Sequence, residues 1–157
     1  MAKEIERKFL VVNDSYKQLA VRRCEISQGY LSSDPRATVR VRIKGDRGFL
    51  TVKGITVGAE RDEWEYEIPL DDARQMLALC GTRVLSKTRW IIPAEVEGWD
   101  NAAWEVDQFH GALEGLTVAE IELPSADLNV SLPTFIGSEV TGDVRYYNSS
   151  LVASIIG

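Results

Sequence analysis

The charges of this chain follow a period of two, and this pattern constrains the fold more than any other feature. Several short segments carry two charges of the same sign at positions i and i+2, with apolar residues between them. In an extended strand such positions lie on one face of the sheet. The pairs are Glu4 and Glu6 (followed by Lys8), Arg40 and Arg42, Glu63 and Glu65, Lys87 and Arg89, Glu105 and Asp107, and Glu120 and Glu122, with Lys53 as a single charge.

One such pair would fit an open sheet with a charged, solvent-exposed face. Six pairs do not fit it well, because like charges this close repel each other and an ordinary exposed face gains nothing from separating the signs. Carboxylate clusters hold hard divalent cations, and clusters of arginine and lysine hold phosphate oxygens. The two kinds of pair together therefore indicate a site for a metal–polyphosphate complex.

Alternation of polar and apolar residues runs through most of the chain and predicts about eight strands. We expect strands over residues 3–12, 22–31, 37–44, 49–53, 60–68, 83–92, 103–109 and 117–123. We expect helices over 71–80 and 143–155 and a short one over 15–20, with loop and helix in the other C-terminal residues. Short strands joined by hairpin turns are typical of an antiparallel sheet or barrel, and 157 residues suit one domain over residues 1–157.

Closing the sheet into a barrel with the charges inside would bring all the charged faces onto one axis. The predicted fold is therefore mainly β, an eight-stranded antiparallel barrel with a charged interior and a few flanking helices. A helix over 71–80 would cover part of the outside. The predicted outer face contains Ile5, Phe9, Val39, Val41, Trp64, Tyr66 and Trp90.

The amino-acid composition limits the binding partners and the catalytic groups that this chain can use. The net charge of −6 argues against general nucleic-acid binding. The apolar runs are short and the first residues are charged, so we expect a soluble, cytoplasmic protein with no membrane partner. Two cysteines and one histidine provide neither a disulfide framework nor a histidine-based metal site, and no Walker-type phosphate loop is present. Catalysis would depend on carboxylates, lysine, arginine, tyrosine and a metal.

The ordered motifs of the chain resemble those of the CYTH family, also called triphosphate tunnel metalloenzymes, and in particular its short bacterial inorganic triphosphatases. The segment Glu4-Ile5-Glu6-Arg7-Lys8 is similar to the ExExK signature of that family. The other motifs, in the family's order, are Gln28-Gly29-Tyr30-Leu31, Val39-Arg40-Val41-Arg42, Leu50-Thr51-Val52-Lys53, Lys87-Thr88-Arg89, Glu120-Ile121-Glu122 and Val140-Thr141-Gly142-Asp143-Val144-Arg145-Tyr146.

The resemblance implies a charged tunnel and assigns roles to its residues. Glu63 and Glu65 would hold a second metal or orient water and basic side chains, and Tyr30 would act on the attacking water. Arg145 would lie on a C-terminal helix that plugs the tunnel. The implied ligands of Mg²⁺ or Mn²⁺ are Glu4, Glu6, Glu120 and Glu122, with Asp107 nearby. The implied triphosphate ligands are Lys8, Arg40, Arg42, Lys53, Lys87, Arg89 and Arg145, with Lys87 also in a catalytic role.

The expected activity is hydrolysis of tripolyphosphate to diphosphate and phosphate, because the compact chain has no added domain and no evident nucleobase pocket. Four alternatives stay open: thiamine triphosphatase, nucleoside or RNA triphosphatase, class IV adenylate cyclase, and a non-catalytic polyphosphate-binding module. An organic substrate would need a stacking group, for which Trp99 and Trp104 are candidates. An apolar outer wall would also allow a homodimer.

Overall fold

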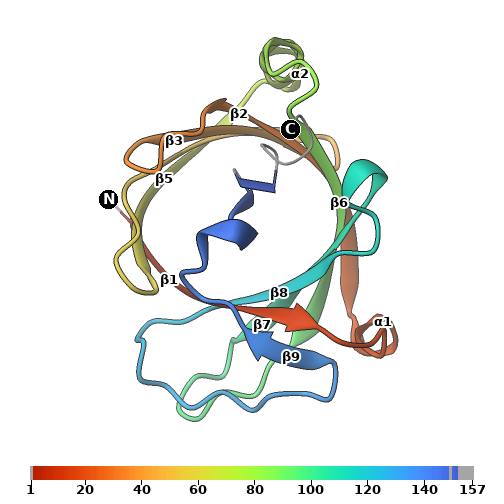
Figure 1. The fold of residues 1–157 in the computed structure, drawn as a ribbon, viewed down its shortest axis with the longest axis vertical. Helices are drawn as coiled ribbons and strands as arrows, with labels where there is room; N and C mark the ends of the chain where they lie inside the picture. The colour runs from red at the N-terminus through yellow and green to blue at the C-terminus, as the bar shows by residue number, and fades with distance from the viewer. Residues whose placement is uncertain (1, 149, 152–157) are drawn as a thin grey trace.

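The computed structural model describes residues 2–148 and 150–151, and the side chains of residues 5–148 and 150–151. Antiparallel strands form one sheet that closes on itself (Figure 1). Its order is β5-β4-β3-β2-β6-β7-β8-β1-β9, and β5 also pairs with β1. The strands are β1 (Ala2–Val11), β2 (Arg22–Ser32), β3 (Thr38–Lys44), β4 (Arg47–Lys53), β5 (Glu60–Ile68), β6 (Val84–Pro93), β7 (Ala103–Phe109), β8 (Thr117–Glu122) and β9 (Ile136–Glu139).

The barrel closes because β5, the first strand in this order, also pairs with β1. Residues Ala2–Ile5 of β1 pair with residues Glu60–Glu63 of β5, and the next residues of β1 pair with β8. The β3–β4 hairpin is tight because Gly45 adopts φ +62, the conformation that a two-residue turn requires at its first position. The eight-stranded antiparallel barrel predicted from the alternation is confirmed.

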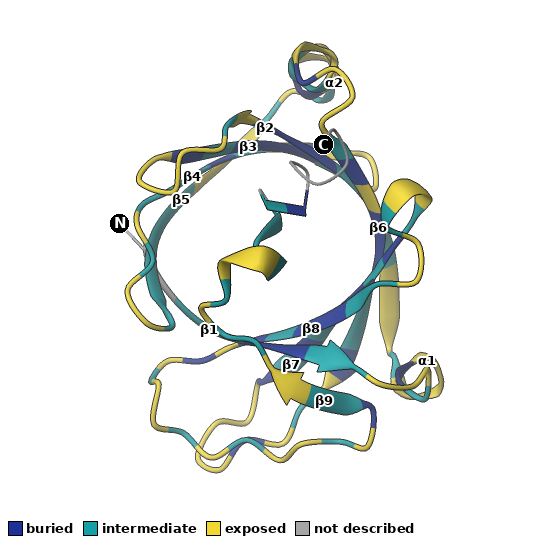
Figure 2. Cartoon of the chain, viewed as in Figure 1, coloured by how far each residue is buried: buried dark blue, intermediate teal, exposed yellow. Residues whose placement is uncertain are grey.

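Two groups of apolar residues are buried on the outside of the barrel wall. Figure 2 shows the segments that cover them lying outside the ring of strands. Helix α2 (Leu70–Leu79) packs over β3, where Val41, Ala73 and Cys80 are buried together. On the opposite side, Phe9 and Trp104 meet Tyr16 of helix α1 (Tyr16–Leu19) and Phe135 in a second core. The predicted helices near 71–80 and 15–20 are therefore present. Among the predicted outer residues, Tyr66 is largely exposed, whereas Phe9 and Val41 are buried in these groups.

The C-terminal segment runs inside the barrel (Figure 1). It contains the 3-10 helix η2 (Val144–Tyr146) and continues to Leu151, whose side chain is buried. A second 3-10 helix, η1 (Gly111–Leu113), connects β7 to β8. Leu151 packs against an apolar cluster on the inner wall made of Tyr30, Leu85, Phe109 and Val118. These wall residues lie near the β2 end, the β6 start, the β7 end and the β8 start, which meet at one end of an antiparallel barrel.

Two expectations for the C-terminal part were wrong. The sequence predicted no strand after residue 123, but β9 pairs with β1 at Phe9 and Val11. The predicted continuous helix from Asp143 is interrupted, because the Asp143 carboxylate caps η2 and Tyr147 returns to an extended conformation (φ −66, ψ 139). The predicted residues 152–155 of that helix lie outside the described residues. No helix in the described part of the chain has the length and apolar character to cross a lipid bilayer.

Candidate active site

A cavity of about 220 Å³ lies inside the barrel between the strands and the C-terminal segment. Most residues that the sequence pattern singled out lie around it, which confirms that the charged faces point inward. Those among the lining are Glu6, Lys8, Tyr30, Arg40, Arg42, Lys53, Glu63, Glu65, Arg89, Glu120 and Glu122. Period-two alternation on neighbouring strands is what directs these side chains to one interior.

The acidic wall comes from β1, β7 and β8, three neighbouring strands. Glu6 lies directly opposite Glu122, and Glu105 lies directly opposite Glu120. Burial alone would raise the pKa of Glu120, but Lys8, then Arg89 and Lys87, outweigh it, and the pKa falls well below its usual range. The Glu6 carboxyl also lies within hydrogen-bonding reach of Glu120. The wall thus concentrates negative charge at adjacent cross-strand positions, where like charges destabilise a sheet.

The basic wall gathers Arg40, Arg42 and Arg89, all of which are buried. Burial lowers the pKa of Arg42, and the nearby Arg40 and Arg89 lower it further. Among the described residues, the buried Nε of Arg40 has no hydrogen-bond partner, although its NH2 group donates to Thr51 at 3.3 Å. A buried donor without an acceptor is costly, so this wall is built to receive an anion.

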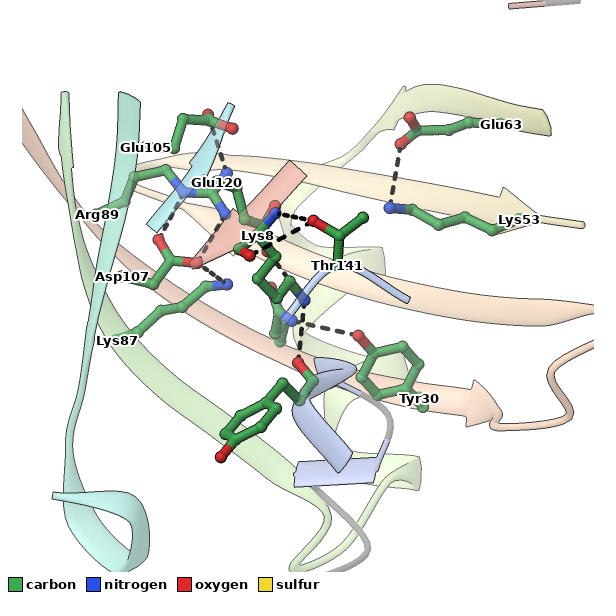
Figure 3. Close-up of polar contacts among 12 residues, drawn as sticks. Lys8, Tyr30, Lys53, Glu63, Lys87, Arg89, Glu105, Asp107, Glu120 and Thr141 are labelled. Atoms are coloured by element: carbon green, nitrogen blue, oxygen red, sulfur yellow. Dashed lines mark hydrogen bonds and ion pairs between the residues drawn. The ribbon is translucent and has the colours of Figure 1, made fainter. Parts of the chain in front are cut away.

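Arg89 of this wall also belongs to a buried ion-pair group with Asp107 and Lys87 (Figure 3). Asp107 accepts from Lys87 at 2.6 Å and from Arg89 at 2.8 and 2.9 Å, in a bidentate arrangement. Burial of the Asp107 carboxylate opposes its ionisation, but Arg89 and then Lys87 outweigh burial and hold the pKa at about 2. Burial also lowers the pKa of Lys87 to about 7, with Asp107 opposing this and Arg89 and Arg42 adding to it. Both oxygens of Asp107 are therefore engaged by cations.

Lys8 ties the C-terminal segment to the acidic wall. Its Nζ lies 3.2 Å from Glu120 and donates to the backbone carbonyl of Tyr146 at 3.0 Å. The ring of Tyr147 lies 5.9 Å from the same Nζ, and its side chain lines the cavity. Burial of Lys8 lowers its pKa, but the charges of Glu120 and Glu6 outweigh the effect of burial. The pKa of Lys8 is therefore raised above its usual value. Lys8 therefore stays charged between two carboxylates.

Strands β4 and β5 supply the third side of the cavity. Lys53 lies 3.9 Å from Glu63 (Figure 3). Glu65 accepts from the Thr51 hydroxyl at 3.1 Å and lies 3.6 Å from Arg40. Glu63 and Glu65 are more exposed than Glu120 and lie next to basic side chains, so they can orient both those bases and a water molecule.

The donor set suits a hard divalent cation, because Glu6, Glu120 and Glu122 present carboxylate oxygens from adjacent strands and a cation would relieve their repulsion. Among the side chains that the structure describes, no three acidic groups are already gathered closely enough to hold a metal ion. The side chain of Glu4 lies outside the described residues. The residues therefore fit a metal as donors, with Lys8 and Arg89 neutralising part of the charge before it binds.

The structure does not bring three of the predicted site residues to the cavity lining. Lys87 and Asp107 are buried and paired with each other, and neither is among the residues that line the cavity. Arg145 is exposed and pairs with Asp143 on its own turn. For Asp107 this argues against a metal role, because its oxygens are already bound by Lys87 and Arg89.

Sequence reasoning missed several lining residues, of which Arg61 is the most basic. Arg61 donates to Thr38 at 2.8 Å and to the carbonyl of Gly54 at 2.6 Å. Arg61 lies two residues before Glu63 on β5 and therefore on the same face of the strand as Glu63 and Glu65. The period-two alternation could therefore have predicted its inward position. Glu105, from the charge pair with Asp107, and Thr141, from the last of the quoted motifs, also line the cavity. The lining residues that the sequence did not single out also include Thr38, Lys44, Thr56, Gly58, Ala59, Tyr147 and Asn148.

Comparison with known proteins finds relatives that match nearly the whole chain. A protein from Acetivibrio thermocellus called inorganic triphosphatase is 48% identical over 153 residues, which cover 97% of this chain and 94% of that protein. An inorganic triphosphatase of Nitrosomonas europaea is 32% identical and covers 97% of this chain and 98% of its own length. A solved inorganic triphosphatase structure superimposes with a TM-score of 0.65 at 30% identity, covering 97% of this chain and 95% of that one. The family model described as the CYTH domain matches residues 2–147. The chain therefore belongs to the CYTH domain family.

Proposed function

We propose that this protein hydrolyses inorganic tripolyphosphate to diphosphate and phosphate, with Mg²⁺ or Mn²⁺ as its cofactor. The observation that carries the proposal is the basic wall, where the buried Arg40 Nε has no acceptor among the described residues and lies beside Arg42 and Arg89. Two relatives with the printed name inorganic triphosphatase, aligned over nearly the whole chain, support this choice of substrate.

In this proposal the basic side chains bind the three phosphates. Arg40, Arg42 and Arg89 offer planar forks that match phosphate oxygens, and Lys8 and Lys53 act as point charges. An arriving polyanion would relieve the mutual repulsion that disfavours the charged form of Arg42. The same groups would stabilise the charge that develops on the leaving diphosphate, which is most of what a protein contributes to phosphoryl transfer.

The acidic side chains Glu4, Glu6, Glu120 and Glu122 would hold the divalent cation. When bound, such a cation polarises a phosphoryl oxygen and lowers the pKa of a bound water. Tyr30, Glu63 and Glu65 would orient the attacking water, whose oxygen bonds to the terminal phosphorus as the bridging oxygen leaves with diphosphate. Lys87 and Asp107 would contribute indirectly, because Asp107 accepts hydrogen bonds from both Lys87 and Arg89 and so fixes the position of the Arg89 guanidinium.

An inorganic substrate is favoured over an organic one by the aromatic residues around the cavity. Those among its described lining residues are Tyr30, which is buried, and Tyr147, whose ring faces Lys8. The two candidates for stacking on a nucleobase lie elsewhere. Trp104 is buried in the outer core, and Trp99 lines a separate surface pocket with residues 94–97 and 129–131.

The test is phosphate release from a panel of substrates: tripolyphosphate, ATP and thiamine triphosphate, each with Mg²⁺ and with Mn²⁺, together with detection of cyclic AMP. We expect the highest kcat/KM for tripolyphosphate. Faster turnover of ATP or thiamine triphosphate, or formation of cyclic AMP, would replace this proposal with the corresponding alternative. Binding of tripolyphosphate without any turnover would make the protein a binding module. Homodimer formation and a cytoplasmic location stay predictions.

A further inference from the structure

Gln28 is a fully buried polar residue that connects the basic wall to Tyr30. It lies on β2 and is 0% exposed. Its Oε1 accepts from Nε of Arg42 at 2.8 Å, and its Nε2 lies 3.4 Å from the hydroxyl of Tyr30. A buried amide is costly unless both its ends are paired, so these two contacts account for a polar side chain at this position.

Arg42 determines which group donates and which accepts in the two hydrogen bonds that link Arg42, Gln28 and Tyr30. A guanidinium can only donate, so the amide oxygen of Gln28 must face Arg42. The amide nitrogen must then face Tyr30, and an amide nitrogen can only donate. The oxygen of Tyr30 is therefore an acceptor toward Gln28, and its own hydroxyl hydrogen is left for a different acceptor.

The position of Tyr30 indicates where that acceptor would be. Its side chain lines the cavity together with Arg42, although Leu151 covers its apolar part. A phosphate oxygen or the attacking water in the cavity is an acceptor of the required kind, and both are supplied by the proposed reaction.

We propose that Gln28 is a positioning residue for triphosphate hydrolysis, which holds Arg42 and forces the hydroxyl of Tyr30 to donate into the cavity. This inference rests on the proposed function, since the acceptor belongs to the substrate or to its attacking water. It also gives Tyr30 a definite role, as a hydrogen-bond donor aligned by Arg42 through Gln28.

Gln28→Glu is the sharpest test, because it keeps the shape and the acceptor for Arg42 but replaces the donor facing Tyr30 with an acceptor. The Tyr30 hydroxyl would then turn to the new carboxylate and away from the cavity. We expect kcat for tripolyphosphate to fall about tenfold or more, to the level of Tyr30→Phe, with KM changed less than about threefold. Gln28→Met loses both contacts, so its kcat should fall and its KM should rise.

The matched control is Gln108→Glu. Gln108 accepts from Trp90 at 3.2 Å on the outer side of the barrel and keeps this contact after the same change of charge. Its kcat and KM should equal those of the wild type. Far-ultraviolet circular dichroism of every variant would establish that the barrel is folded before the kinetic constants are compared.

The double variant Gln28→Glu/Tyr30→Phe should have the same kcat as Tyr30→Phe alone, because both changes remove one interaction. The proposal would be overturned if kcat of the double variant fell by the product of the two single-variant reductions. A wild-type kcat for Gln28→Glu would also overturn it. If the wild type releases no phosphate, the proposed function fails, and the ultraviolet difference spectrum between Gln28→Glu and wild type tests the contact separately. The Tyr30 absorption should shift because an acceptor replaces the Gln28 donor, and this shift should be absent when the same pair is compared in the Tyr30→Phe background. An unchanged spectrum would show that Gln28 does not control Tyr30.

Discussion

At Asp107, burial opposes the charged form of the carboxylate and neighbouring cations favour it. Its carboxylate is almost completely buried, yet Arg89 and Lys87 hold its pKa at about 2. Removing one partner of a buried ion pair leaves the other charges uncompensated. Asp107→Asn should therefore lower the free energy of unfolding by about 3–5 kcal/mol near neutral pH, as measured by urea denaturation.

The same variant makes a prediction about pH. Because the pKa of Asp107 is lowered by folding, its contribution is complete above the ordinary pKa of 3.8 and is lost as the pH falls toward 2. The stability difference between wild type and Asp107→Asn should shrink between pH 5 and about pH 2.5. The control is Asp71→Asn, which removes an exposed pair with Arg74 and should cost less than about 1 kcal/mol at every pH. Equal losses in the two variants would contradict the buried-pair account.

Glu6 lies opposite Glu122 and within hydrogen-bonding reach of Glu120, so its negative charge is a cost to the metal-free protein. Glutamine at this position removes one negative charge and offers Glu120 an N–H donor that an ionised glutamate lacks. Without metal, Glu6→Gln should melt at the wild-type temperature or a few degrees higher, because relieving one cross-strand repulsion contributes roughly 0.2–1 kcal/mol. With Mg²⁺ and tripolyphosphate, the wild type should gain stability and the variant should gain little. A variant that melts well below wild type in EDTA would make Glu6 a structural residue rather than a metal ligand.

At the scale of secondary-structure elements, helix α2 packs closely on β4 of the barrel at Gly48. A Cβ at Gly48 on β4 would lie 2.6 Å from the Cβ of Ala73 in α2. Gly48→Ala should therefore push the helix outward and cost about 1–3 kcal/mol of unfolding free energy, since overpacking is destabilising. Gly54→Ala is the control, because its nearest neighbour would be Asp62 at 3.7 Å, an ordinary contact. If the two variants unfold alike in urea, α2 is not packed against β4 as described.

The sequence could predict the elements that have their own alternation and not those that depend on tertiary pairing. Strand β3 alternates Arg40 and Arg42 with valines, so its bounds and its inward face were both predictable. Strand β9 has four residues and no such alternation, and its extended form depends on pairing with the end of β1. For the site, the period-two alternation placed the basic side chains inside the barrel. It could not show which of them line the cavity and which, like Lys87, are buried in ion pairs away from it. The capping of η2 by Asp143 also could not be read from the chain, and it keeps Arg145 beside Asp143.

At the scale of the whole molecule, one barrel end is filled by an apolar cluster and the remaining interior is charged. Leu151 packs against Tyr30, Leu85 and Phe109 inside the barrel, while the acidic and basic walls face each other across the cavity. Neither wall compensates the other completely, because Arg40 keeps an unpaired Nε among the described residues and Glu6 and Glu122 lie opposite each other. A triphosphate together with a divalent cation would supply both missing charges at once.

The central claim is that this interior hydrolyses a metal–triphosphate complex, and phosphate release from tripolyphosphate with controlled metal tests it most directly. With EDTA in excess, we expect no release above the no-enzyme rate. Addition of Mg²⁺ or Mn²⁺ should restore release of one phosphate for each diphosphate formed, and Ca²⁺ should support it poorly because it prefers a larger and looser oxygen shell. Undiminished turnover in EDTA would contradict the account.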